Sequence, residues 1–196
     1  MQACHLSASN LACRRGERLL FRGVDLALEP GEACHVAGPN GIGKTSLMRI
    51  LAGLLRPFSG EVNRTGSVAL LDERPALDPQ LSLGSALAFW ADLDGVATQE
   101  RAACTGHVGL SDLLEVPVRF LSTGQRKRAA LARMKGQQAP IWLLDEPLNG
   151  LDTAGVALTE IMVANHCAAG GIAVVASHQP MALPMASTLQ LAEFVP

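Results

Sequence analysis

Residues 38–45 read GPNGIGKT and fit the pattern G-x-x-x-x-G-K-[ST], which is typical of a phosphate-binding loop. Glycines let such a loop turn its backbone N–H groups inward around an anion, because no Cβ blocks the required dihedral angles. The run before it, residues 33–37, predicts a short strand, and the apolar spacing after it predicts a helix. An ordinary glycine turn is the alternative interpretation, which this strand–loop–helix setting disfavours.

Each part of the predicted loop has a chemical task. The N-terminus of the following helix adds about half a positive charge. Lys44 is expected to reach the β- and γ-phosphates of a nucleotide, and Thr45 to offer its hydroxyl to Mg²⁺. The residues expected to bind nucleotide here are Gly38, Pro39, Asn40, Gly41, Ile42, Gly43, Lys44, Thr45 and Ser46.

Working outward, strands alternate with helices along the chain. Residues 141–144 and 172–176 are apolar runs, each of which predicts a buried strand, and a helix is expected between them over 153–168. We expect helices from about 79 to 135 and shorter strands near 24–28, 61–62 and 67–71. This alternation predicts an α/β fold with a mostly parallel sheet covered on both faces. In the helix that starts at Lys44, the predicted buried face is Leu47, Ile50, Leu51 and Leu54, with Pro57 and Gly60 ending the helix.

Composition limits the class of protein. The chain has 196 residues, 16 Lys and Arg against 18 Asp and Glu, and 48% hydrophobic residues. This length suits one domain, 1–196, and the formal charge of −2 lacks the basic excess of nucleic-acid-binding proteins. No apolar run is long enough to span a bilayer and residues 1–15 lack the core of a signal peptide, so we expect a cytosolic protein. The five scattered cysteines are expected to be small buried hydrophobes.

Polar residues follow both buried strands. Asp145 can hold Mg²⁺ at the phosphate edge, and Glu146 can act as general base toward an attacking water. His178 follows the strand at 172–176. Ligands of parallel sheets lie beyond the carboxyl ends of the strands, so these groups are expected to meet the glycine loop there. Solvated acids and a surface histidine at strand ends are the alternative interpretation.

A third element precedes the acidic strand. Residues 121–128 read LSTGQRKR and run into an alanine-rich helix. Ser122 and the Gly124 backbone can open a helix N-terminus, a second anion site. From spacing alone, a capped helix with a basic, solvated face remains possible. Binding of nucleic acid by residues 126–128 is a weaker interpretation, given the acidic balance of the chain.

Residues 121–125 closely resemble the signature motif (LSGGQ) of ATP-binding-cassette (ABC) ATPases, and the resemblance extends over essentially the whole chain. Residues 148–152, LNGLD, resemble the family's D-loop, and His178 resembles its switch histidine. The resemblance implies a P-loop NTPase with a RecA-like core, an N-terminal antiparallel β subdomain and an inserted helical subdomain at about 79–135. It also implies ATP with Mg²⁺, integral membrane partners, and a head-to-tail homodimer. In that dimer Ser122, Gly124 and Gln125 act on the ATP of the partner, and His178 contacts the γ-phosphate.

The chain departs from the family pattern at three positions. Arg15 occupies the place of an aromatic residue that stacks on adenine, a role that a guanidinium can also take. Arg74 occupies the place of the Q-loop glutamine, although arginine cannot accept a hydrogen bond or ligate Mg²⁺. Thr123 replaces the first glycine of the signature, a mild change.

Shorter stretches resemble one branch of the family, the ATPase subunits of bacterial cytochrome c maturation haem exporters. They are residues 15–21, Trp142 and residues 177–180. The expected function is therefore ATP hydrolysis coupled to membrane subunits at the cytoplasmic face of the inner membrane, for haem export. Alternatives are an ABC transporter for another substrate, a soluble cassette ATPase acting on nucleic acid or ribosomes, and a degenerate scaffold. Membrane subunits are expected to dock around residues 74–90, where Leu83, Leu87 and Phe89 are either docking or core residues.

Overall fold

The computed structural model describes residues 4–72, 75–183 and 186–196. The chain divides into two compact units, which we describe separately. Unit 1 comprises Met1–Asp72, Pro140–Pro147 and Glu160–Pro196, and unit 2 comprises Glu73–Ala139 and Leu148–Thr159. The helical region expected at about 79–135 falls within unit 2.

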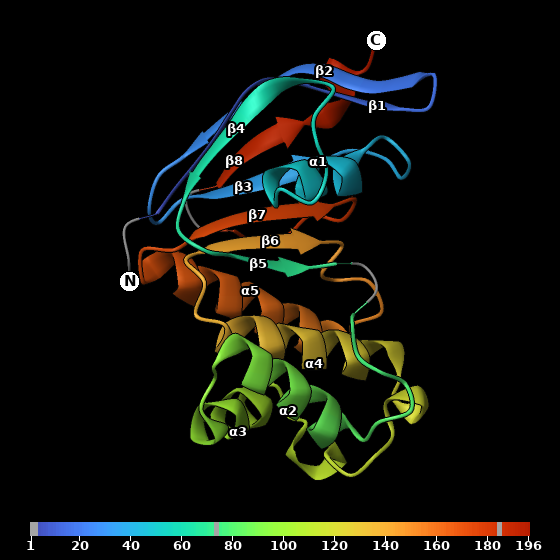
Figure 1. Ribbon diagram of the computed structural model, residues 1–196, viewed down its shortest axis with the longest axis vertical. Helices are drawn as coiled ribbons and strands as arrows, with labels where there is room; N and C mark the ends of the chain where they lie inside the picture. The colour runs from blue at the N-terminus through green and yellow to red at the C-terminus, as the bar shows by residue number, and fades with distance from the viewer. Residues whose placement is uncertain (1–3, 73–74, 184–185) are drawn as a thin grey trace. The chain divides into compact units, whose positions relative to one another are not determined.

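A five-stranded parallel sheet forms the centre of unit 1 (Figure 1), in the order β5-β6-β7-β3-β8. Its strands are β5 (Val68–Leu71), β6 (Ile141–Asp145), β7 (Ile172–Ser177), β3 (Ala33–Ala37) and β8 (Ala186–Gln190). Every residue of β6 and β7 is buried, as expected for central strands of a sheet that is covered on both faces. The predicted α/β fold with a mostly parallel sheet is confirmed.

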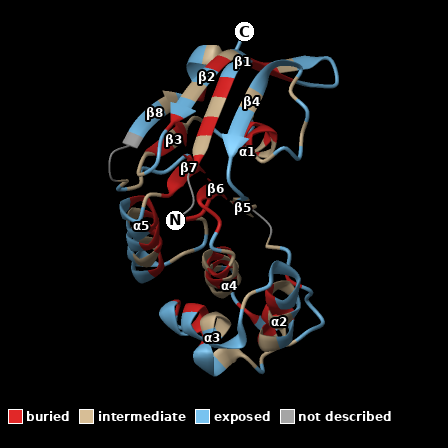
Figure 2. Cartoon of the chain, turned by 60° about the vertical axis from the view of Figure 1, so that its left-hand side comes forward, coloured by how far each residue is buried: buried red, intermediate tan, exposed pale blue. Residues whose placement is uncertain are grey.

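A three-stranded antiparallel sheet, in the order β2-β1-β4, completes unit 1. Its strands are β1 (His5–Arg15), β2 (Arg18–Leu28) and β4 (Ser59–Thr65). Helix α1 (Lys44–Leu51) contacts β6 and β7 of the parallel sheet and β1 of the antiparallel one. Buried side chains of both sheets and of α1 form a single hydrophobic core, which includes Leu6, Phe21, Leu47, Met48 and Val174. Figure 2 colours all buried residues of the chain red.

Helix α1 ends earlier than its apolar spacing predicted. Its last residue is Leu51, and Gly53 takes a left-handed conformation with φ +77°. The N–H of Leu54 then bonds to the carbonyl of Arg49 at 2.8 Å, so the chain turns away and the Leu54 side chain is 69% exposed. The prediction that Leu54 lies on the buried face, with Pro57 and Gly60 ending the helix, was wrong because the left-handed Gly53, directly after the Ala52 C-cap, stops the helix first.

Unit 2 contains helices α2 (Leu83–Asp94), α3 (Thr98–His107) and α4 (Thr123–Gly136), which pack on one another. Helix α2 ends at Asp94, and Gly95 is its left-handed C-cap. The first turns of α5 (Thr153–Ala168) also belong to this unit, and the rest of α5 belongs to unit 1. Within unit 1, His166 of α5 stacks on Trp142 of β6 with ring centroids 4.0 Å apart.

The cysteines and the helices bear on two further expectations. All five cysteines are buried and free, which confirms their assignment as small core residues. Among the described residues, no helix combines the length and the apolar character needed to cross a bilayer.

Candidate functional site

Three adjacent strands of unit 1 deliver polar residues to one edge of the parallel sheet. The register pairs Ala37 of β3 with Ser177 of β7, and Asp145 of β6 with Ala176 of β7. The strand ends therefore lie side by side, and the chain continues from them into the loop at 38–43, into Glu146 and into His178. The structure thus brings together three of the groups that sequence analysis expected at one edge.

The loop at 38–43 has the backbone that an anion cradle requires. Gly38, Gly41 and Gly43 have φ values of +152°, +78° and +120°, which residues with a side chain rarely adopt. A Cβ on Gly43 would lie 3.1 Å from Cδ1 of Phe21, so β2 packs closely beneath the loop. Helix α1 starts at the next residue, Lys44, and adds its N-terminal dipole to the loop.

Lys44 is folded back into this loop. Its side chain is only 5% exposed, and its Nζ donates to the carbonyl of Gly38 at 2.7 Å. Longer contacts reach the Pro39 carbonyl at 3.4 Å and Asn40 Oδ1 at 3.5 Å. The same Nζ lies 3.0 Å from Oε1 of Glu146. A buried ammonium group in this position is compensated by charge as well as by hydrogen bonds.

Glu146 connects the lysine to the histidine. It is 7% exposed, its N–H bonds to the Ala176 carbonyl at 2.8 Å, and its Oε2 lies 2.9 Å from Nδ1 of His178. Burial alone raises the pKa of Glu146, but the hydrogen bonds and charges of Lys44 and His178 outweigh it, so the net pKa is lowered. Glu146 is therefore an ionised carboxylate at neutral pH, able to accept a proton.

The expected Mg²⁺ ligands lie beside this cluster in the chain. Asp145, the last residue of β6, is almost completely buried, and Thr45 is the second residue of α1. A hydroxyl and a carboxylate are hard oxygen donors of the kind that Mg²⁺ prefers, together with phosphate oxygens and water. Among the described residues, no group of three or more His, Cys, Asp or Glu forms a metal cluster. The donor set fits a metal held jointly with a phosphorylated substrate.

Two of the expected nucleotide-binding residues have side chains that point into the core. Ile42 packs against the hydrophobic core of unit 1. Ser46 is buried and hydrogen-bonds to the thiol of Cys13, whose pKa burial nevertheless raises. Their contribution to anion binding would therefore come from backbone N–H groups.

The signature residues lie together at the start of α4, in unit 2. Ser122 is the N-cap, and its Oγ accepts from the N–H of Gln125 at 3.1 Å. The Oε1 of Gln125 accepts in turn from the N–H of Ser122 at 2.8 Å, which completes a capping box. Gly124 lies between them in the first turn. The hydroxyl hydrogen of Ser122 takes no part in these two bonds and can donate to an anion.

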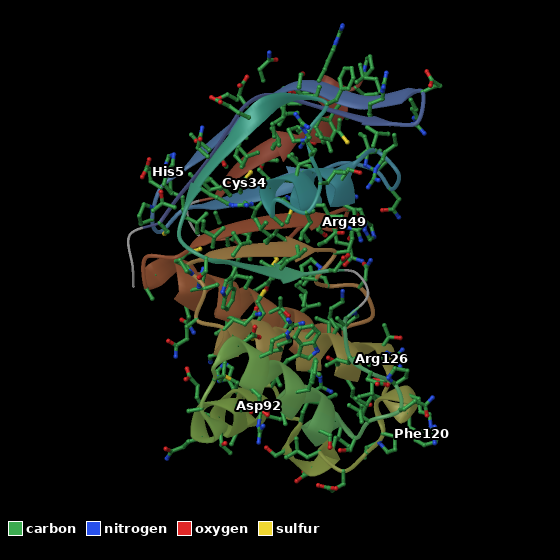
Figure 3. The ribbon with its side chains drawn as sticks, viewed as in Figure 1. His5, Cys34, Arg49, Asp92, Phe120 and Arg126 are labelled. Carbon is green, nitrogen blue, oxygen red and sulfur yellow. The ribbon has the colours of Figure 1, made fainter. Side chains whose placement is uncertain are left out.

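The basic run after the signature is not the solvated face considered above. Lys127 is 2% exposed, and Arg128 donates to the Val108 carbonyl. Arg126, labelled in Figure 3, donates to the Leu121 carbonyl at 2.5 Å. The two arginines are folded onto their own unit because their guanidinium groups donate to backbone carbonyls.

Two arginines occupy positions where the chain departs from the family pattern. Arg15 is exposed at the end of β1, paired with Arg18 across the β1–β2 turn, whereas Arg74 lies outside the described residues.

Sequence reasoning missed two contacts near the site. Phe21 packs under Gly43, and His35 Nε2 lies 3.3 Å from the carbonyl oxygen of Ser177, next to His178. A histidine within an otherwise apolar strand was the one available signal for the second contact.

Comparison with known proteins shows which family the chain resembles. A family model described as "ABC transporter" matches residues 21–149. A protein of Novosphingobium aromaticivorans named "Cytochrome c biogenesis ATP-binding export protein CcmA" is 56% identical over 196 residues and covers 100% of both chains. A protein of the same name from Zymomonas mobilis is 49% identical, covering 98% of this chain and 85% of its own.

Solved structures agree on the fold. A Pyrococcus furiosus protein described as an ABC transporter ATP-binding protein matches with a TM-score of 0.86 at 23% identity, over 98% of this chain and 100% of the other. An ATP-binding subunit of an ABC transporter matches with a TM-score of 0.80 at 20% identity, over 89% of this chain and 79% of the other.

Proposed function

The chain belongs to the ABC transporter family of ATP-binding proteins, and from this membership we propose the reaction, the assembly and the cargo that follow. It hydrolyses ATP as a subunit of an export system for cytochrome c biogenesis, and the cargo is haem. The observation that carries the reaction is the contact of Glu146 with both Lys44 and His178 at the phosphate loop.

In the proposed reaction, the N–H groups of the glycine loop and the ammonium of Lys44 hold the β- and γ-phosphates. A water oxygen attacks the γ-phosphorus, the bond to the β–γ bridging oxygen breaks, and ADP departs with that oxygen. Glu146 takes the proton of the attacking water. His178, bonded to Glu146 at 2.9 Å, orients the carboxylate and faces the γ-phosphate.

Phosphate competes with Glu146 for the lysine. Nζ of Lys44 already contacts Gly38, Pro39, Asn40 and Glu146, which is more partners than its three hydrogens can satisfy in full. Phosphate oxygens would replace some of these partners. Bound Mg²⁺, held by Thr45 and Asp145, would neutralise phosphate charge.

The assembly is a head-to-tail homodimer in which Ser122, Gly124 and Gln125 of one copy contact the ATP held by Lys44 of the other. This role is supported by the capped N-terminus of α4, which presents N–H groups and the Ser122 hydroxyl to an anion. The dimer is attached to integral membrane subunits at the cytoplasmic face of the bacterial inner membrane.

Two substitutions test the reaction. Glu146→Gln should retain ATP binding, lower turnover by about 10²–10⁴-fold because the proton acceptor is lost, and accumulate ATP-bound dimer. Lys44→Ala should lose both binding and turnover. The exposed Glu61→Gln on β4 is the matched control and should behave as the unmodified protein. Turnover that Glu146→Gln leaves unchanged would remove Glu146 from the mechanism.

The cargo is tested separately. Deleting the chain should abolish c-type cytochromes in the cell, and the purified protein should bring integral membrane subunits with it. An active ATPase whose loss leaves c-type cytochromes intact would contradict the cargo and leave the reaction standing.

A further inference from the structure

Two glycines bring the segment at 148–152 into backbone contact with the first turn of α4, within unit 2. A Cβ placed on Gly124 would lie 2.8 Å from the carbonyl oxygen of Gly150. A Cβ placed on Gly150 would lie 2.8 Å from Cγ2 of Thr123, and Gly150 has φ +78°. Neither position has room for a side chain, so the two segments interlock through their backbones and through the Thr123 methyl group.

Thr123 makes a different contact with each branch of its side chain. Its Oγ1 accepts from Nη2 of Arg126 at 3.4 Å, while Nη1 of the same guanidinium donates to the Leu121 carbonyl. Cγ2 faces Gly150. A β-branched side chain has few χ1 rotamers, so the Arg126 contact helps to keep the methyl group directed at Gly150. A glycine at this position, as in the family pattern, would have neither contact.

We propose that Thr123 is a positioning residue, which fixes the first turn of α4 against the segment at 148–152. That turn carries Ser122, Gly124 and Gln125, so the inference rests on the proposed function of these three residues. Thr123 stands where the family pattern has a glycine, and its methyl group contacts Gly150. This replacement therefore has a specific structural role. Loss of the methyl contact would let the turn shift, and small misplacements of contacting groups can reduce rates by up to about 10²-fold.

A matched pair of substitutions separates the two branches. Thr123→Ser keeps the hydroxyl and removes the methyl group, whereas Thr123→Val keeps a methyl group and removes the hydroxyl. We expect Thr123→Ser to lower kcat for ATP about fivefold or more, and Thr123→Val to lower it less than about twofold. The KM for ATP should change less than kcat in both variants, because the phosphate loop, which makes the other contacts with ATP, is unchanged.

A double substitution tests the contact with Gly150 directly. Gly150→Ala introduces a Cβ at a positive φ, 2.8 Å from Cγ2 and 3.2 Å from Cβ of Thr123. Removing Cγ2 relieves the shorter of these two contacts and leaves the backbone cost. Thr123→Ser with Gly150→Ala should therefore be at least about threefold more active than Gly150→Ala alone. Thermal unfolding of each variant, followed by circular dichroism, verifies that the chains are folded.

Several outcomes would overturn the proposal. They are equal kcat for Thr123→Ser and the unmodified protein, additive effects in the double variant, and lowered thermal stability with unchanged kcat. The serine–valine pair decides the matter even if Gly150→Ala does not fold. Failure of the proposed function itself has a separate sign, which is turnover that survives Lys44→Ala and Glu146→Gln.

Discussion

Glu146 combines a left-handed backbone, φ +47°, with two charged neighbours, and its ionisation is linked to folding. Because its pKa in the folded chain is below the usual value of 4.5, the folded state binds fewer protons near that pH than the unfolded one. Its contribution to stability is therefore present above pH 4.5 and is lost as the pH falls through the folded pKa.

This linkage gives the first prediction. The unfolding free energy in urea should fall more steeply below pH 4.5 for the unmodified protein than for Glu146→Gln, which has no carboxyl group to protonate. Exposed Glu61→Gln serves as the control and should retain the slope of the unmodified protein. Parallel curves for the unmodified protein and Glu146→Gln would show that the ion pair does not stabilise the fold.

His166 gives a second prediction, at higher pH. Burial against Trp142 lowers its pKa below 6.5, although hydrogen bonds to the carbonyls of Ile172 and Pro140 oppose the shift. The unfolded chain therefore takes up a proton first as the pH falls, and stability decreases below pH 6.5. His166→Phe keeps a ring on Trp142 without titrating, so its melting temperature should fall less between about pH 7.5 and about pH 5.5. An equal fall would exclude His166 as the source.

At the scale of single residues, the sequence predicted which side chains lie close together but not which hydrogen bonds they form. Motif and strand-end position were sufficient to place Lys44, Glu146 and His178 at one edge. The return of Nζ to the Gly38 carbonyl and to Glu146 was not predictable, because a lysine has four flexible bonds and takes the partners that the folded backbone offers. The roles assigned to these residues remain predictions.

At the scale of elements, the sequence predicted the central strands of the parallel sheet and the helix between them. The predicted helix at 153–168 matches α5, and the buried strands match β6 and β7 within a residue. Strand β1 was missed because the register shifts near Asn10, at φ +49°, interrupt its alternation of buried and exposed residues. Strand β8 was missed because its short sequence, ASTLQ, has little apolar character before it pairs with β3.

The C-terminus of α1 supports a prediction for one element. Gly53→Ala should destabilise the protein by about 1–2 kcal/mol or more, because it forces a Cβ to φ +77° and into the Arg64 guanidinium. That guanidinium donates to the Leu51 carbonyl and so helps to end the helix. Gly170→Ala, at φ +86° with nothing within 4 Å, carries the backbone cost alone and serves as the control. Equal losses in urea unfolding would show that Arg64 adds nothing.

At the scale of the whole molecule, each unit carries one part of the proposed machinery. Unit 1 holds the phosphate loop with Glu146 and His178, and unit 2 holds the signature turn with Thr123 and Gly150. Both parts were predicted from local motifs, whereas the interlock of Thr123 with Gly150 needs segments far apart in the chain to pack together. Periodicity and motifs do not report such contacts.

The surface of unit 2 also carries the expectation about membrane partners. Leu83 and Leu87 prove to be core residues of α2, whereas Phe89 is 59% exposed and Leu93, one turn further, is 67% exposed. Figure 3 labels Asp92 on the same helix. We predict that this exposed apolar pair contacts the integral membrane subunits, because exposed apolar groups of this kind are typical of interaction sites.

This prediction can be tested with two phenylalanines of nearly equal exposure. Phe89→Asp should release the protein from membranes that contain its partner subunits while its own ATPase rate is unchanged, because a charge in an apolar contact is costly to desolvate. Phe58→Asp is the matched control, since Phe58 is 58% exposed and belongs to unit 1; it should remain attached. The measurement is co-sedimentation with membranes, alongside the hydrolysis rate of each purified variant. If Phe89→Asp remains attached, or if both variants are released alike, the prediction that α2 docks the membrane subunits is wrong. A docking contact made by α2 should be lost only when the substitution is in unit 2.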